Sequence, residues 1–144
     1  MSVSTDAPRP PWGPGFLRLT AWPYRAEMAV ATIVLFLMVF YWRGLVVGDL
    51  NVPLAIGWVV FPDVAAFLPI GISSRGGRRW PTWGPTLYNV FHSLLVWAPV
   101  FLLWSVLEGH VEWPLLGWAG HITADRATGF YLRARPTGAA EPPS

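Results

Sequence analysis

The sequence contains no cysteine and no lysine, and charged residues of either sign are scarce. Without cysteine the chain forms no disulfide, thiolate metal site, iron–sulfur cluster or c-type haem attachment. Without lysine it forms no Schiff base, which excludes retinal proteins and lysine-dependent covalent enzymes. Charged residues are 12% of the 144 residues, against roughly 25% in soluble domains, while 53% are apolar. A formal net charge of only +2 also argues against a nucleic-acid partner, so the composition favours a small membrane protein.

Four apolar stretches predict membrane-spanning helices. The segment from Arg25 to Arg43 would rise about 27 Å as a helix, close to the roughly 30 Å hydrocarbon thickness. We expect kinks at prolines within the second and third stretches, including one at Pro99. The predicted spans cover residues 26–47, 52–72, 86–107 and 113–132, of which the last is the least hydrophobic. The expected fold is an all-α, integral membrane four-helix bundle.

The two ends of the chain have the composition of tails. Prolines concentrate between Pro8 and Pro14, so residues 1–25 are predicted to be a disordered cytoplasmic tail, and residues 133–144 a second one. Arginines cluster before the first span, between the second and third, and after the fourth, whereas the other two loops hold only Arg43. By the positive-inside rule both ends face the cytoplasm, as in a multi-pass protein of the bacterial inner (plasma) membrane.

Polar side chains inside the predicted spans are the main functional signal, because charged groups at membrane depth are costly. At about 1.5 Å per residue, Asp63, His92 and Asp125 lie about 12 to 14 Å from the cytoplasmic ends of three different spans. His121 is four residues before Asp125, and Asn89 three before His92, and both separations place side chains on one helix face. We therefore expect one polar layer in the inner half of the bundle.

Small residues lie just before the histidine of the fourth span. Gly117 and Gly120 precede His121, and small residues allow a neighbouring helix to come close in membrane proteins. We expect tight packing around this part of the fourth span.

Three motifs occur in order along the chain: Pro62-Asp63, Tyr88-Asn89-x-x-His92, and an ending that runs from His121 through Asp125-Arg126 to Gly129. Together they resemble the small bacterial integral membrane proteins classified as domain of unknown function 4260, over roughly residues 24 to 133. The ending departs from the family's Gly-Tyr-Gly, because this chain has Gly129-Phe130-Tyr131. The resemblance implies a membrane topology but no reaction, since the family has no assigned activity.

The polar layer suggests a metal site. Two imidazoles with one or two carboxylates suit zinc, iron or manganese. The predicted ligands are Asp63, His92, His121 and Asp125, with Asn89 and Arg126 as orienting or substrate-facing groups of a catalytic centre. Such an ion would activate water, so the first hypothesis is a metal-dependent membrane hydrolase that acts on membrane lipid or a lipid-like molecule.

Other functions use the same residues without catalysis. Hydrogen bonds within the polar layer could hold the helices in register. A histidine could be the axial ligand of haem or a chlorin, with Trp58, Trp97 and Trp118 as flat walls, or the layer could carry protons. The chain could also be a homo-oligomer or an accessory subunit of a larger membrane complex.

Overall fold

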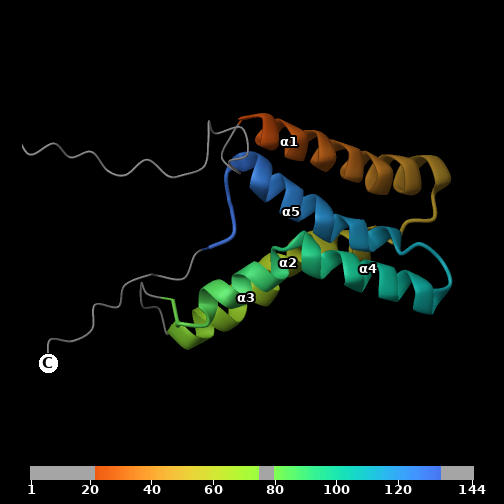
Figure 1. Ribbon diagram of the computed structural model, residues 1–144. Helices are drawn as coiled ribbons and strands as arrows, with labels where there is room; N and C mark the ends of the chain where they lie inside the picture. The colour runs from red at the N-terminus through yellow and green to blue at the C-terminus, as the bar shows by residue number, and fades with distance from the viewer. Residues whose placement is uncertain (1–21, 75–79, 134–144) are drawn as a thin grey trace, which may run out of the picture.

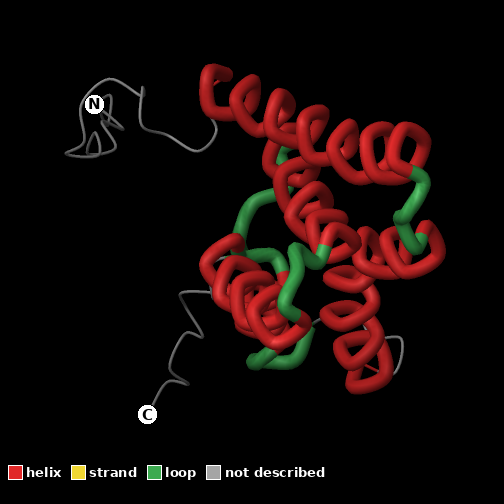
Figure 2. The backbone as a smooth tube through the Cα atoms, turned by 90° about the vertical axis from the view of Figure 1, so that its right-hand side faces the viewer, coloured by secondary structure: helices red, strands yellow, loops and turns green. Residues whose placement is uncertain are grey.

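The computed structural model describes residues 22–74 and 80–133, which form helices joined by short turns and contain no strand. Figure 1 shows the helices with their labels, and Figure 2 the same backbone from the side. In chain order they are α1 (Trp22–Phe36), its π-helical continuation η1 (Leu37–Val47), α2 (Val52–Ser74), α3 (Gly84–Phe91), α4 (Leu94–Glu108), the 3-10 turn η2 (Trp113–Leu115) and α5 (Leu116–Thr128).

The first two predicted spans are confirmed as long apolar helices. The stretches Trp22–Val47 and Val52–Ser74 are each long and apolar enough to cross a membrane. The first begins four residues earlier than predicted, so the predicted tail is wrong for residues 22–25. Pro23 lies in the first turn, where its missing N–H costs no helical hydrogen bond. The rest of both predicted tails, residues 1–21 and 134–144, lies outside the described residues.

The third apolar stretch is divided into two helices. Instead of one helix bent at Pro99, α3 and α4 meet at 50° across His92 and Ser93. Helix α4 runs without interruption through Pro99, so the break lies earlier in the chain than predicted. The Ser93 hydroxyl accepts a hydrogen bond from the Leu95 N–H at 3.3 Å and so caps the start of α4.

Helix α5 is the central helix of the fold rather than a confirmed fourth span. It has 13 residues, which rise about 20 Å and fall short of the roughly 30 Å hydrocarbon region. Every residue from Pro114 to Gly120 is buried, and α5 packs against both α1 and α2. Figure 1 shows α5 running beside α1. Its low hydrophobicity is explained by these contacts, because its surface faces protein.

The predicted close approach of a neighbouring backbone is confirmed at Gly117, whereas the close neighbour of Gly120 is a side chain. A Cβ atom on Gly117 would lie 2.8 Å from the Ala55 carbonyl oxygen of α2. A Cβ on Gly120 would lie 2.8 Å from the Phe36 ring of α1. The α1–α5 pair is also joined by the Thr32 hydroxyl, which donates to the Thr123 hydroxyl oxygen at 2.9 Å. The absence of a side chain at these two glycines thus allows α5 to pack closely against α1 and α2.

Candidate metal centre

The structure brings the four predicted metal ligands together from three parts of the chain. Asp63 comes from α2, His92 from the α3–α4 break, and His121 and Asp125 from successive turns of α5. His92 Nε2 lies 3.2 Å from Asp63 Oδ1 and 3.7 Å from Asp125 Oδ2. His121 Nε2 lies 3.6 Å from each of the same two oxygens. The predicted convergence of these side chains is therefore what the structure shows.

Hydrogen bonding fixes which nitrogen of His92 faces the carboxylates. His92 Nδ1 lies 2.9 Å from the Tyr88 carbonyl oxygen, which only accepts hydrogen bonds, so Nδ1 carries the hydrogen. In the neutral ring Nε2 then presents a lone pair to the oxygens of Asp63 and Asp125. Lone pairs repel at such distances, so a cation, either a proton or a metal ion, is needed between them. Backbone-oriented imidazoles of this kind are common among metal ligands.

His121 adds a second imidazole nitrogen to the cluster. Its Nε2 is buried and makes no hydrogen bond within residues 22–74 and 80–133, although it points toward two carboxylates. Two protonated imidazoles at this locus would repel each other, since the ring centroids of His92 and His121 are 5.4 Å apart. One divalent ion could satisfy both nitrogens at once.

The spacing of the donor atoms suits a single ion. Donor atoms of Asp63, His92 and His121 all lie within 4.8 Å of one another. Ligands at about 2.1 Å from a tetrahedral ion are separated by about 3.4 Å. Asp125 contacts both imidazoles but falls outside this set of three, and the Tyr88 hydroxyl, 3.4 Å away, donates to its Oδ2. The group thus consists of three close donors and a fourth carboxylate beside them.

The break that positions His92 is stabilised by donors from α5. A helix that ends leaves backbone carbonyls without partners. The Trp118 indole N–H donates to the Phe91 carbonyl oxygen at 2.7 Å, and Arg126 Nη2 donates to the His92 carbonyl oxygen at 3.2 Å. The α3–α4 break and α5 therefore hold each other in register, which fixes the imidazole of His92 relative to His121.

Arg126 has a positioning contact rather than a contact with the carboxylates. Besides the His92 carbonyl, its guanidinium reaches the Tyr24 hydroxyl at 3.4 Å, and the side chain is buried. Within the described ranges it forms no ion pair with Asp63 or Asp125. Of the two predicted roles, the contacts favour orientation over substrate contact.

The Asn89 side chain forms hydrogen bonds with the segment after α5 and not with the cluster. Its amide nitrogen donates to the Arg133 carbonyl oxygen at 2.8 Å, and its Oδ1 accepts from the Arg133 N–H at 2.7 Å. The Arg133 guanidinium in turn lies 4.5 Å from the centroid of the Trp80 ring. These contacts give no support to the predicted orienting or substrate-facing role of Asn89. They show instead that Asn89 binds the backbone of Arg133.

Replacing Asn89 with alanine should therefore loosen residues 129–133 and leave the cluster intact. We expect amide hydrogen exchange in that segment to rise at least tenfold, because both hydrogen bonds to the Arg133 backbone are lost. Bound metal should stay near the wild-type level. A loss of metal equal to that of a histidine variant would show instead that Asn89 is a ligand.

Tyr88 contacts two members of the cluster, although no role was predicted for it from the sequence. Its ring stacks on the His92 imidazole with centroids 3.9 Å apart and planes 12° apart. The signal was the helical spacing of four residues between Tyr88 and His92, which places the two rings on one face. Tyr88 thus orients His92 through ring stacking and through its carbonyl oxygen, which accepts from Nδ1. Its hydroxyl donates to Asp125 and so orients that carboxylate.

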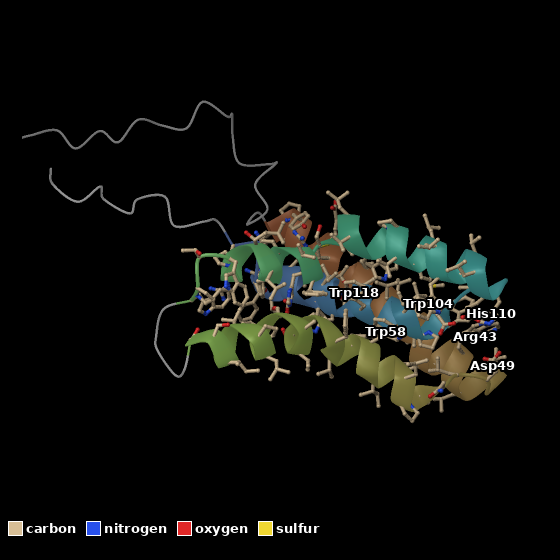
Figure 3. The ribbon with its side chains drawn as sticks, turned by 90° about the horizontal axis from the view of Figure 1, so that it is seen from below. Arg43, Asp49, Trp58, Trp104, His110 and Trp118 are labelled. Carbon is tan, nitrogen blue, oxygen red and sulfur yellow. The ribbon has the colours of Figure 1, made fainter. Side chains whose placement is uncertain are left out.

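The tryptophans proposed as walls for a tetrapyrrole have protein partners. The rings of Trp58 and Trp118 stack on each other with centroids 6.0 Å apart. Figure 3 labels both residues, near the middle of the molecule. Trp97 stacks on Phe101 and donates its N–H to the Leu115 carbonyl oxygen. These contacts do not favour a flat macrocycle between the rings.

No known family, curated protein or solved structure matches the chain. The resemblance to domain of unknown function 4260 therefore stays a prediction from the three motifs.

Proposed function

We propose that the protein is a metal-dependent membrane hydrolase in which Asp63, His92 and His121 hold a divalent ion. One observation carries the proposal: the Nε2 atoms of His92 and His121, both imidazole nitrogens, face the same oxygen of Asp63 at 3.2 and 3.6 Å. Two imidazoles and a carboxylate suit zinc, iron or manganese. Three protein ligands leave a coordination position for water, as in catalytic sites.

Asp125 is placed to act as the general base. Its Oδ2 lies beside both imidazoles and accepts a hydrogen bond from the Tyr88 hydroxyl, so its orientation is fixed. When bound, the ion would supply Lewis-acid activation of a water molecule. Asp125 would take a proton from that water as its oxygen bonds to the ester carbon or phosphorus, and then pass the proton to the leaving alcohol oxygen as that bond breaks.

The exposure of Asp63 supports a lipid-like substrate. Its side chain is 46% exposed, whereas that of His92 is 3% exposed, so the site is closed on one side and open on the other. Asp63 is the middle residue of α2, about 16 Å along the axis from either end. Val60 and Phe67, which share its helix face, are exposed apolar residues. A molecule with an acyl chain could therefore approach sideways from the membrane.

The arrangement of the helix ends supports the proposal that one end of the molecule faces the cytoplasm. The start of α1, the end of α2, the start of α3 and the end of α5 lie at that end (Figure 1). The arginine clusters of the sequence flank these helix ends, so we place them at the cytoplasmic side of the bacterial inner membrane. The pair α3 and α4 would then serve as the third span.

Hydrolysis can be tested with purified protein in vesicles made from bacterial lipids. We expect time-dependent release of fatty acid or of a phosphorylated headgroup, measured by mass spectrometry. Chelation should abolish release, and zinc, manganese or ferrous iron should restore it. Asp125→Asn should keep bound metal but lower the rate by about 10²-fold or more, as the loss of a general base does.

The matched control is Glu108→Gln, because it also exchanges a carboxylate for an amide and Glu108 is an exposed residue at the end of α4. That variant should hydrolyse lipid at the wild-type rate. Metal-loaded protein that leaves every lipid class unchanged would overturn the hydrolase proposal and leave the metal site standing.

A further inference from the structure

A second polar site lies at the opposite end of the molecule from the chain's first and last described residues. A pocket of about 540 Å³ opens between the turn that joins η1 to α2 and the turn that follows α4. This volume falls within the roughly 300 to 1,000 Å³ of small-molecule sites. Its polar and aromatic lining comprises Arg43, Asp49, Asn51, His110, Glu112 and Trp113. Figure 3 labels Arg43, Asp49 and His110, which gather at this end.

Arg43 offers a donor for an anionic group. Its Nη2 pairs with Asp49, and the guanidinium lies 4.9 Å from the centroid of the Trp113 ring. These contacts fix the side chain, which is 24% exposed, and its Nη1 makes no hydrogen bond in residues 22–74 and 80–133. A phosphate oxygen is a strong acceptor for a guanidinium N–H.

Glu112 offers an acceptor for a cationic group. Its backbone N–H donates to the Ser105 hydroxyl oxygen at 3.2 Å, which holds the turn, while no cation of the described chain pairs with its carboxylate. Asp49, although paired with Arg43, adds a second carboxylate to the wall. The pocket is therefore lined by a guanidinium N–H and by the carboxylate of Glu112, neither of which has a partner in the described residues.

The position of the pocket indicates where its occupant comes from. It lies where the stretch Trp22–Val47 ends and the stretch Val52–Ser74 begins, at one boundary of both apolar helices. Exposed Trp42 and Trp104 lie in the second halves of η1 and α4, and exposed tryptophans are typical of the headgroup level of a bilayer. Lipid headgroups are thus the molecules most concentrated at this site.

We propose that this pocket binds the headgroup of a zwitterionic phospholipid with a primary amine, as in phosphatidylethanolamine. The phosphate would accept from Arg43 Nη1, and the ammonium would donate to Glu112 and Asp49. Two carboxylates disfavour a purely anionic headgroup. A choline group is disfavoured because quaternary ammonium needs free aromatic faces, and Arg43 covers that of Trp113. The pocket also contributes no residue to the group with metal-ligand spacing.

Native mass spectrometry of the full chain can test this proposal. The protein would be released from micelles that contain equal amounts of phosphatidylethanolamine, phosphatidylglycerol and phosphatidylcholine with identical acyl chains. We expect bound phosphatidylethanolamine to exceed each of the others by about fivefold, which corresponds to about 1 kcal/mol. Glu112→Gln and, separately, Arg43→Gln should abolish this preference.

The matched control is Glu108→Gln, because Glu108 is the exposed last residue of α4 and does not line the pocket. It should keep the wild-type preference, and thermal melting should show all three variants folded. Equal binding of the three lipids, or a preference that survives Glu112→Gln, would overturn the proposal. If millimolar O-phosphoethanolamine displaced the lipid, the pocket would bind the free phosphate ester, and the proposal of a lipid occupant would be overturned. Because the pocket shares no residue with the metal centre, its failure would leave the hydrolase proposal untouched.

Discussion

Replacing Gly117 with alanine should lower the stability of the folded protein in detergent by about 2 to 3 kcal/mol, the upper part of the range for overpacked cores. The new Cβ would lie 2.8 Å from the Ala55 carbonyl oxygen and 2.9 Å from Val59 Cγ2. A backbone oxygen cannot rotate away as a flexible side chain can, so α5 and α2 would have to separate. Thermal or denaturant unfolding followed by circular dichroism measures the effect.

Gly57→Ala is the matched control for this substitution. Gly57 lies within α2, and no neighbouring atom lies within 4 Å of the position that a Cβ would take there, so the extra methyl group meets open space. Alanine at this position should leave stability unchanged or raise it slightly, because alanine favours helix more than glycine does. Equal unfolding midpoints for the two variants would contradict the close approach of α5 to α2.

The first two helices could be predicted because hydropathy reports contact with lipid. Both are exposed apolar helices, so their sequence carries the signal directly. Hydropathy is less informative for α5, whose surroundings are largely protein. A helix enclosed by α1 and α2 needs small and polar residues for close packing, such as Gly117 and Thr123, and these lower its hydropathy.

The break between α3 and α4 could not be placed from local sequence. Pro99 was the expected position, yet the break occurs where distant side chains supply the missing hydrogen bonds, through Trp118 and Arg126. Those partners become visible only when α5 is packed. The one local signal was Ser93, a residue type favoured at helix starts.

The candidate site was more predictable than the fold around it. Histidine and aspartate at helical spacing within apolar stretches indicated a shared polar layer, and the structure gathers Asp63, His92, His121 and Asp125. Asn89 shares the face of His92 by spacing alone, but its partner is the backbone of Arg133, a contact that no periodicity reveals.

Alanine in place of His92 or His121 should remove the metal ion from the protein. Each substitution deletes one of three close donors, and we expect affinity to fall by more than about 100-fold, because loss of supporting groups alone costs 10- to 100-fold. His110→Ala removes an exposed histidine outside the group and should bind metal as the wild type does. Comparison of the three variants separates a site-specific loss from a general effect of removing imidazole.

The metal content per chain of the purified, folded protein is the decisive quantity, determined by inductively coupled plasma mass spectrometry after exchange into metal-free buffer. We expect one zinc, iron or manganese ion per chain in the wild type and in His110→Ala, and almost none in His92→Ala and His121→Ala. Folded wild-type protein without metal, even after incubation with each ion, would refute the metal centre and leave the cluster as an ion-paired polar layer.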